Sequence, residues 1–264
     1  MSTILDTIAA ATRERVATAK EQTPLDAMRA AARAMPAETG FPFERALRGA
    51  DIGFICECKK ASPSKGVIAE DFPYRRIARE YEAAGAAAIS VLTEPQWFLG
   101  RNDYLREIAA DVSVPCLRKD FTVDEYMIYE AKTLGAAAVL LIVSLTDEDT
   151  LRRWIALCDE LGLSALVEVR SEEEIAIALR AGSRVIGVNN RDLRDFTVDT
   201  GRSGRLRRLV PESVLFVAES GISSAADVDT LRRAGVNGVL IGERLMRAPD
   251  KRAVLQALRG GAPS

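Results

Sequence analysis

The 264-residue sequence contains no histidine. Imidazole is the usual proton shuttle near neutral pH, the usual base of a catalytic triad and a frequent metal ligand, so every scheme that needs it is excluded. Acid–base chemistry must therefore use lysine, glutamate, aspartate, tyrosine or cysteine side chains.

Cysteine is also scarce, with four residues in the whole chain. Cys56 and Cys58 are two apart, so on a strand their side chains share one face. No second pair and no histidine completes a metal site around them. We interpret them as small buried side chains between sheet and helices. No metal is predicted, and nothing in the cysteine pattern suggests secretion.

Strong net charge and long apolar runs are missing as well. The 36 basic and 38 acidic residues give a net charge of -2, which produces no long-range field for nucleic acid or an anionic membrane. No apolar stretch reaches membrane-spanning length, and charged residues interrupt the N-terminus where a signal peptide has its apolar core. We therefore predict a cytoplasmic protein without nucleic-acid or membrane partners. The basic run is expected to be a solvated helix face; its members are Arg202, Arg205, Arg207 and Arg208.

One pattern recurs along the chain: an amphipathic stretch ends in glycine and is followed by an apolar run. Glycine at these points lets a helix stop and the chain return to a sheet. Alternating helices and strands predict a parallel sheet, and eight such units favour a closed (β/α)₈ barrel, of about 250 residues. We expect one domain over residues 1–264, since no linker separates two smaller ones. The predicted strands are 54–59, 87–92, 114–118, 138–143, 163–168, 184–189, 214–218 and 237–241.

Residues 1–50 precede the first predicted strand and form an N-terminal helical extension. Ile4, Leu5 and Ile8 share one face of its first helix. The extension is expected to lie against the barrel, either over its mouth or against its bottom.

Ionisable residues stand at the carboxyl ends of several predicted strands, where parallel α/β folds build their active sites. Side-chain alternation places Glu57 on the same inner face as Lys59. An inward Glu-x-Lys pair is costly to bury unless it is paired or has a task. Six polar residues are expected to converge at one mouth: Glu57, Lys59, Lys119, Glu168, Asn189 and Glu219.

The loops after the first, seventh and eighth strands indicate a phosphate site. Barrel enzymes often bind phosphate with backbone N–H groups of the last two of these loops. Candidate ligands are Ser62, Ser220, Gly221 and Gly242. The loop at 97–99 is either a hydrophobic plug or part of an aromatic pocket, and its place near the mouth favours the pocket.

These segments resemble the indole-3-glycerol phosphate synthase family. The similar segments, in order between about residues 40 and 247, are 57–66 (ECKKASPSKG), 117–121 (LRKDF), 166–169 (LVEV), 186–193 (IGVNNRDL), 218–222 (AESGI) and 240–243 (LIGE). The resemblance implies a lyase of tryptophan biosynthesis. Its substrate is 1-(2-carboxyphenylamino)-1-deoxyribulose 5-phosphate, which closes to indole-3-glycerol phosphate with loss of carbon dioxide and water.

The resemblance also implies residue roles, with no cofactor and no metal. Lys119 is the general acid of ring closure, and Lys59, beside Glu57, binds the substrate carboxylate and is a candidate second acid; the division of acid roles between the two lysines is left open. Glu168 acts as acid and base. The remaining implied roles are substrate positioning by Asn189 and Glu219, phosphate binding by Ser62, Gly221 and Gly242 with Ser220 nearby, loop organisation by Arg191 and ring packing by Phe98.

Some points stay open. A phosphoribosylanthranilate isomerase-like enzyme or a non-catalytic phosphate-binding barrel are the alternatives, and the protein is expected to be a monomer or weak homo-oligomer. Lys59 nearby would lower the pKa of Lys119, whereas carboxylates would raise it.

Overall fold

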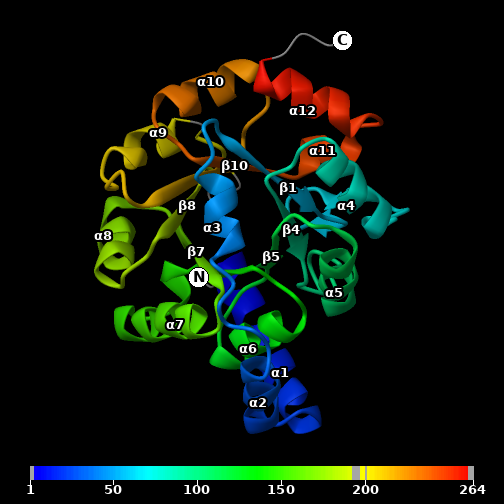
Figure 1. The fold of residues 1–264 in the computed structure, drawn as a ribbon, viewed down its shortest axis with the longest axis vertical. Coiled ribbons are helices and arrows are strands. Elements are labelled where there is room, and N and C mark those ends of the chain that lie inside the picture. Colours follow the sequence, from blue (N-terminus) through cyan, green and yellow to red (C-terminus); the bar gives the residue numbers. More distant parts are fainter. Residues whose placement is uncertain (1–2, 192–196, 200, 261–264) are drawn as a thin grey trace.

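A computed structural model describes residues 3–191, 197–199 and 201–260. Asp192 and Leu193, which belong to the 186–193 segment, lie outside the described residues. Eight parallel strands close into one barrel with helices around it (Figure 1), which confirms the predicted (β/α)₈ fold. In spatial order they are β1 (Gly53–Cys58), β10 (Gly238–Ile241), β9 (Leu215–Glu219), β8 (Val185–Asn189), β7 (Ser164–Val169), β6 (Ala138–Ile142), β5 (Cys116–Lys119) and β4 (Ala88–Leu92).

The predicted strand positions agree with these bounds except for small shifts at some strand ends. β5 begins at Cys116 rather than at Val114, and it includes Lys119. Pro115 has no N–H to donate, although its carbonyl accepts from the backbone N–H of Ile89 at 3.0 Å. Val143, predicted as strand, instead begins the short 3₁₀ helix η1 (Val143–Leu145).

Two apolar layers follow from side-chain alternation on the strands. One fills the barrel interior and includes Ile55, Leu117 and Leu166; the other lies between strands and helices and includes Cys56 and Cys58, as predicted. The outer helices are α4 (Tyr74–Ala83), α5 (Asn102–Asp111), α6 (Glu125–Thr133), α7 (Glu148–Glu160), α8 (Glu172–Arg180), α9 (Arg202–Arg207), α10 (Ala225–Arg233), α11 (Glu243–Arg247) and α12 (Lys251–Arg259). A small hairpin of β2 (Ala61–Ser62) and β3 (Gly66–Val67) follows β1.

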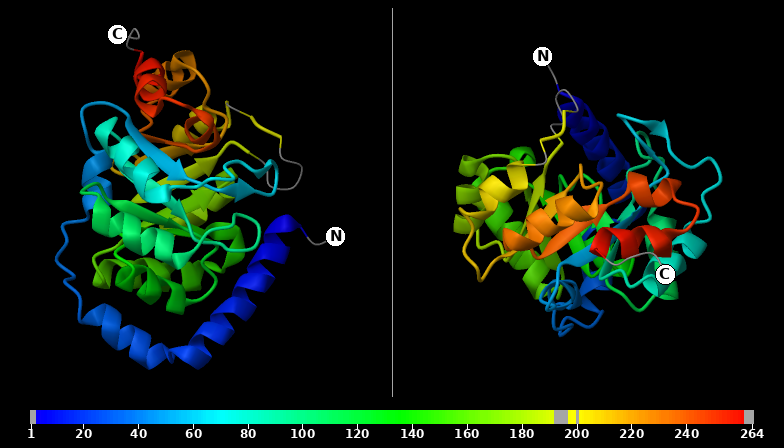
Figure 2. Two further views of the ribbon diagram at one scale, coloured as in Figure 1. Left: turned by 90° about the vertical axis from the view of Figure 1, so that its right-hand side faces the viewer. Right: turned by 90° about the horizontal axis from the view of Figure 1, so that it is seen from above.

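The N-terminal extension covers both ends of the barrel. Both expected positions, over the mouth and against the bottom, are therefore occupied by different parts of it. Figure 2 (left) shows α1 (Ile4–Gln22) at one end, α2 (Leu25–Arg33) below the barrel, and a connecting segment that rises along the opposite end to α3 (Pro42–Leu47). Leu5 and Ile8 of α1 line the cavity at the mouth. Phe43 and Leu47 of α3 are buried in the interior layer and close the bottom.

The basic run on α9 is not uniformly solvated, and for Arg207 the expectation was wrong. Its side chain is buried, and the guanidinium donates to the carbonyls of Gly235 at 2.8 Å and Val210 at 2.6 Å. Arg202 is half-buried and donates to the carbonyl of Asn189 at 3.2 Å. Arg205 and Arg208 are exposed, as expected. The carbonyls left at the ends of neighbouring elements explain why a guanidinium is accommodated there.

The floor formed by α3 should contribute strongly to stability. Leu47 is 1% exposed, so Leu47→Ala leaves a cavity and should lower the free energy of unfolding by about 2–5 kcal/mol, measured by urea denaturation. Leu209→Ala, at a leucine that is 44% exposed, is the control and should cost no more than about 0.5 kcal/mol. Equal small effects of both substitutions would show that α3 is not part of the core.

Candidate active site

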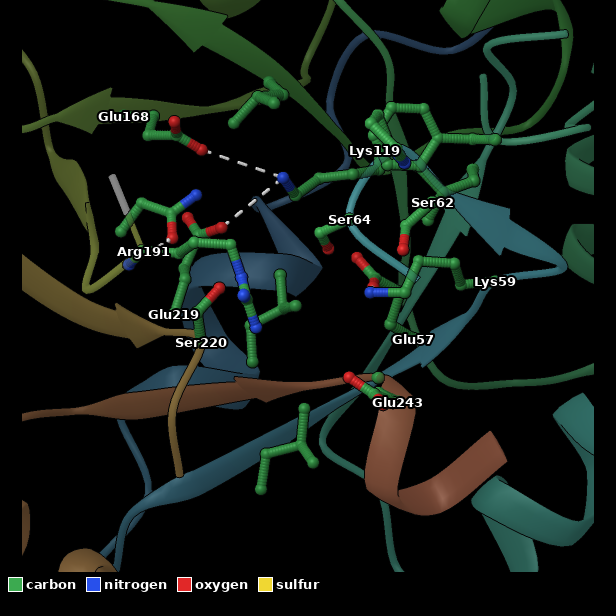
Figure 3. A pocket seen from close by; sticks show the side chains of 18 of the residues that line it. Glu57, Lys59, Ser62, Ser64, Lys119, Glu168, Arg191, Glu219, Ser220 and Glu243 are labelled. Atoms are coloured by element: carbon green, nitrogen blue, oxygen red, sulfur yellow. Dashed lines mark hydrogen bonds and ion pairs between the residues drawn. The ribbon is translucent and has the colours of Figure 1, made fainter. Parts of the chain in front are cut away.

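A cavity of about 440 Å³ opens at the carboxyl ends of the barrel strands. Figure 3 shows polar side chains pointing into it from several strands. All twelve residues proposed from the sequence line it, so the structure brings the whole predicted set together. They are Glu57, Lys59, Ser62, Phe98, Lys119, Glu168, Asn189, Arg191, Glu219, Ser220, Gly221 and Gly242.

Lys119 lies between two buried carboxylates (Figure 3). Its Nζ is 3.4 Å from Glu219 Oε2 and 3.7 Å from Glu168 Oε2. Burial alone would lower the pKa of Lys119, but Glu219, Glu168 and Glu57 raise it above its ordinary value. The carboxylates therefore decide the balance that the sequence left open, and they keep this ammonium group protonated.

Glu219 has the opposite environment. Its side chain is 1% exposed, and burial together with Glu168 raises its pKa from 4.5 to about 7 although Lys119 opposes the shift. Oε1 of Glu219 has no hydrogen-bond partner among the described groups. A carboxyl group that titrates near neutral pH, with one oxygen unused, can accept a proton or a hydroxyl hydrogen from a bound molecule.

Glu57 and Lys59 form a second ion pair across the cavity, with Oε1 and Nζ 2.6 Å apart. Burial would raise the pKa of Glu57, but Lys59 and Lys119 hold it below its ordinary value. Gly242 faces this pair: a Cβ there would lie 2.4 Å from Glu57 Oε1 and 3.0 Å from Lys59 Nζ. Glycine at 242 therefore leaves room for the ion pair, a requirement that the sequence pattern did not reveal.

The loop after β9 has an unusual backbone. Ser220 and Gly221 adopt φ angles of 66° and 75°, in the left-handed region that is unfavourable for serine. Asn190, which sequence reasoning missed, donates from Nδ2 to the Ser220 carbonyl at 3.0 Å, and its Oδ1 accepts from Ser203. This side chain holds the loop that carries the proposed phosphate ligands. The adjacent asparagine pair at 189–190 was a signal for it.

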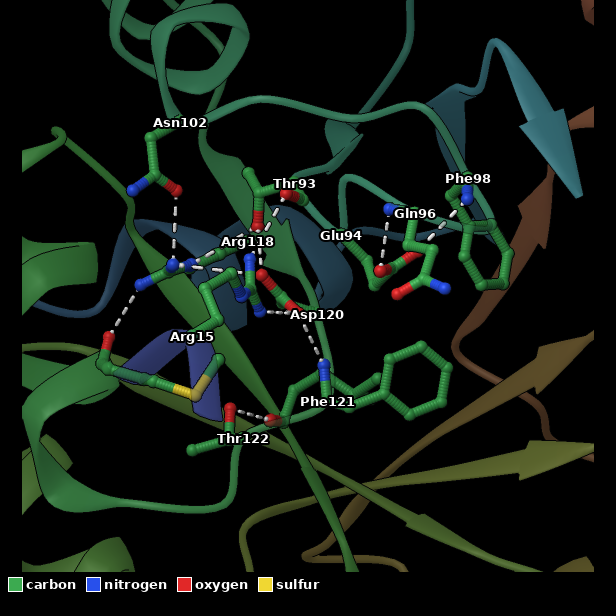
Figure 4. A network of polar contacts seen from close by, with 12 residues as sticks. Arg15, Thr93, Glu94, Gln96, Phe98, Asn102, Arg118, Asp120, Phe121 and Thr122 are labelled. Carbon is green, nitrogen blue, oxygen red and sulfur yellow. Dashed lines mark hydrogen bonds and ion pairs between the residues drawn. The ribbon is translucent and has the colours of Figure 1, made fainter. Parts of the chain in front are cut away.

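One wall of the cavity is apolar. Phe98 lines it and packs against Phe121, with ring centroids 5.9 Å apart, which favours the pocket over the plug for this loop. The Glu94 carboxylate fixes the loop by accepting from the backbone N–H groups of residues 96, 97 and 98 (Figure 4). Sequence reasoning missed Phe121, Leu140 and Ile142, which also line the cavity, although alternation on β6 places Leu140 and Ile142 inside.

The cavity supplies ammonium, carboxylate and hydroxyl groups rather than a metal cage. Among the described residues no group of three or more acidic, histidine or cysteine side chains could hold a metal ion. None of the described helices is long and apolar enough to cross a membrane.

The raised pKa of Glu219 has a consequence for stability. The folded state holds this proton more tightly than the unfolded chain, so the linked stability is complete below pH 4.5 and is lost as pH rises through about 7. Glu219→Gln removes this dependence. The free energy of unfolding of the variant minus that of the wild type should therefore increase between about pH 5 and pH 8 in urea denaturation. A flat difference for Glu219→Gln would contradict the shift.

Solved structures with the same fold are distant in sequence. The chain is similar to thiamine phosphate pyrophosphorylase from Pyrococcus furiosus, with a TM-score of 0.59 and 17% identity over 79% of this chain and 94% of that one. It is also similar to N-acetylmannosamine-6-phosphate 2-epimerase from Clostridium perfringens, with a TM-score of 0.59 and 15% identity over 74% of this chain and 88% of the other. These likenesses support the barrel fold alone.

Sequence relatives are much closer. Indole-3-glycerol phosphate synthase from Ruminiclostridium cellulolyticum is 53% identical, over 98% of this chain and 100% of the relative. The protein of that name from Endomicrobium trichonymphae is 51% identical over 97% and 99%. The family model for indole-3-glycerol phosphate synthase matches residues 5–258. The chain therefore belongs to the indole-3-glycerol phosphate synthase family.

Proposed function

We propose that this chain is the carboxy-lyase that forms indole-3-glycerol phosphate from 1-(2-carboxyphenylamino)-1-deoxyribulose 5-phosphate, in tryptophan biosynthesis. Besides the family assignment, one observation supports this proposal: the protonated Lys119 contacts the buried Glu219, whose pKa is about 7. An acid and a group able to take up or release a proton near neutral pH therefore stand side by side next to an apolar wall.

In the proposed ring closure, the ring carbon that bears the carboxylate attacks the ribulose carbonyl carbon. Lys119 donates a proton to the carbonyl oxygen as the new carbon–carbon bond forms. Loss of carbon dioxide then returns the bonding electrons to the ring. Burial of Lys119, with a 15% exposed side chain, strengthens its field at the oxygen on which charge develops.

The second stage is dehydration. The hydroxyl formed from the carbonyl leaves as water, and the methylene carbon between it and the nitrogen loses a proton, which forms the carbon–carbon double bond of the indole while the nitrogen keeps its hydrogen. Glu168 is 2% exposed and lies beside the Lys119 ammonium, which places it to exchange protons in this stage. Glu219, with its unpartnered oxygen, and Asn189 are proposed to hold the substrate hydroxyls and amine.

The rest of the cavity suits the two anionic ends of the substrate. Lys59 is proposed to bind the carboxylate, with Glu57 fixing the ammonium group at 2.6 Å. At the phosphate end we propose Ser62 and the backbone of Ser220, Gly221 and Gly242 as ligands, with Arg191 organising the neighbouring loop. Phe98, beside Phe121, is proposed to pack against the anthranilate ring.

An isomerase that uses a cysteine acid–base group fits this cavity poorly. No cysteine is among the described residues that line it, and all four cysteines are buried elsewhere. Each cysteine thiol has its pKa raised by burial, which disfavours the reactive thiolate. A non-catalytic barrel is disfavoured because the buried charges would be costly to keep without a task.

Four further expectations stay predictions. Residues 1–264 are expected to behave as one domain with 1–50 as an extension. The protein is expected to be cytoplasmic, and to be a monomer or weak homo-oligomer that works without a cofactor.

Lys119→Met tests the proposed acid. Removing the ammonium group should lower kcat about a hundredfold or more without added metal, followed by the fluorescence of the indole product. Lys251→Met is the matched control, since Lys251, like Lys119, is a half-buried lysine, with a 10% exposed side chain, and it is paired to a glutamate at 3.3 Å. It lies outside the cavity and should leave kcat near the wild-type value. Comparable rates for wild type and Lys119→Met would remove Lys119 from its role.

A further inference from the structure

The N-terminal helix is connected to the active site by a half-buried ion pair. Arg15 of α1 donates to Asp120 Oδ1 at 2.8 Å and to the Thr93 carbonyl at 3.4 Å (Figure 4). The Asp120 side chain is fully buried, and that of Arg15 is 28% exposed. The pair joins residues 105 positions apart in the chain, so it is a long-range tertiary contact between the extension and the barrel.

Asp120 lies between Lys119 and Phe121 in the sequence. All three residues line the cavity. Its carboxylate accepts from the Phe121 backbone N–H at 2.8 Å and from Thr93 Oγ1 at 2.6 Å. One buried carboxylate therefore fixes the backbone immediately after the proposed acid.

The same carboxylate reaches the outer helices through Arg118. Arg118 Nη2 lies 3.7 Å from Asp120 Oδ2 and 2.6 Å from Glu130 Oε2 of α6. Its guanidinium also donates to Asn102 on α5 at 3.1 Å and to the Met127 carbonyl on α6 at 2.8 Å. Arg118 and Asp120 of the barrel are thus held by several contacts, whereas the contact from α1 to this network is made by Arg15.

A second ion pair on α1 is of a different kind. Lys20 Nζ and Asp124 Oδ2 are 2.7 Å apart, but both side chains are about one third exposed, at 32% and 31%. Partly exposed pairs contribute little to stability, whereas loss of one partner leaves a buried charge without compensation. Arg15 is therefore the stronger connection between α1 and the segment that carries Lys119.

We propose that Asp120 is a positioning residue that, through Arg15, couples the docking of α1 over the cavity to the placement of the Lys119–Phe121 segment. When α1 is docked, Leu5 and Ile8 complete the cavity lining and the Asp120 carboxylate is paired with Arg15 at 2.8 Å. When α1 leaves, Asp120 keeps Arg118 at 3.7 Å but loses its closest cation, so the segment after Lys119 relaxes. The kinetic part of this inference rests on the proposed function; the structural part does not.

Arg15→Gln is the test, and Lys20→Gln on the same helix is the matched control. Arg15→Gln should speed amide hydrogen exchange both in α1 and in the segment from Cys116 to Phe121. Lys20→Gln should leave exchange in the Cys116–Phe121 segment unchanged. This readout needs no substrate, so it stands even if the proposed reaction were wrong. Faster exchange confined to α1 in Arg15→Gln would overturn the coupling.

Kinetics supply the second arm. Arg15→Gln should lower kcat/KM by about tenfold or more, with a rise in KM from the lost wall and a fall in kcat from the displaced acid. Arg15→Lys keeps the charge and should recover part of the loss. Asp120→Asn should lower kcat, and adding Arg15→Gln to it should cost less than in the wild type. Additive losses, or no change in kcat for Arg15→Gln, would show that α1 and Lys119 are independent.

Discussion

The active-site end of the barrel depends on the mutual compensation of buried charges. Glu57, Glu168 and Glu219 are each at most 4% exposed, and they share the cavity with the ammonium groups of Lys59 and Lys119. Glu168 and Glu219 share one ammonium group, that of Lys119. Burial, together with Glu168 and Glu57, raises the pKa of Glu219 to about 7 although Lys119 opposes the shift. The crowding that makes the cluster costly thus creates a proton-accepting group beside a proton donor.

The barrel accommodates this cluster because Gly187 on β8 and Gly242, directly after β10, carry no side chain. A Cβ at Gly187 would lie 2.5 Å from Glu219 Oε1, and one at Gly242 would lie 2.4 Å from Glu57 Oε1. Each glycine leaves the space that one carboxylate occupies, and neither adopts a positive φ angle. Glycine is needed at both positions for space rather than for its backbone conformation. A larger residue on β8 would displace the Glu219 carboxylate of β9, and one directly after β10 would displace the Glu57 carboxylate of β1.

Strand positions and inner-face residues could be predicted because both follow from a period of two and from the place of polar residues at strand ends. The pattern could not predict which end of the barrel the first 50 residues cover, since an apolar helix face does not identify its partner. It also could not predict the direction of the Lys119 pKa shift, which depends on distances of 3.4 and 3.7 Å to two carboxylates. Arg207 was misjudged and Asn190 was missed for a related reason: each binds a backbone carbonyl far along the chain, that of Gly235 and that of Ser220, and sequence spacing carries no information about such contacts.

The position of α1 gives the charged cluster its dielectric environment. Leu5 and Ile8 add apolar surface above Lys119 and its carboxylates, and excluding water there strengthens each electrostatic interaction within the cavity. An apolar lid fixed only by its apolar face could slide, because hydrophobic contact has little directional preference. The bond from Arg15 to Asp120, by contrast, fixes α1 at one point directly beside Lys119. Docking of this helix and the local environment of the proposed acid therefore share one contact, the ion pair between Arg15 and Asp120.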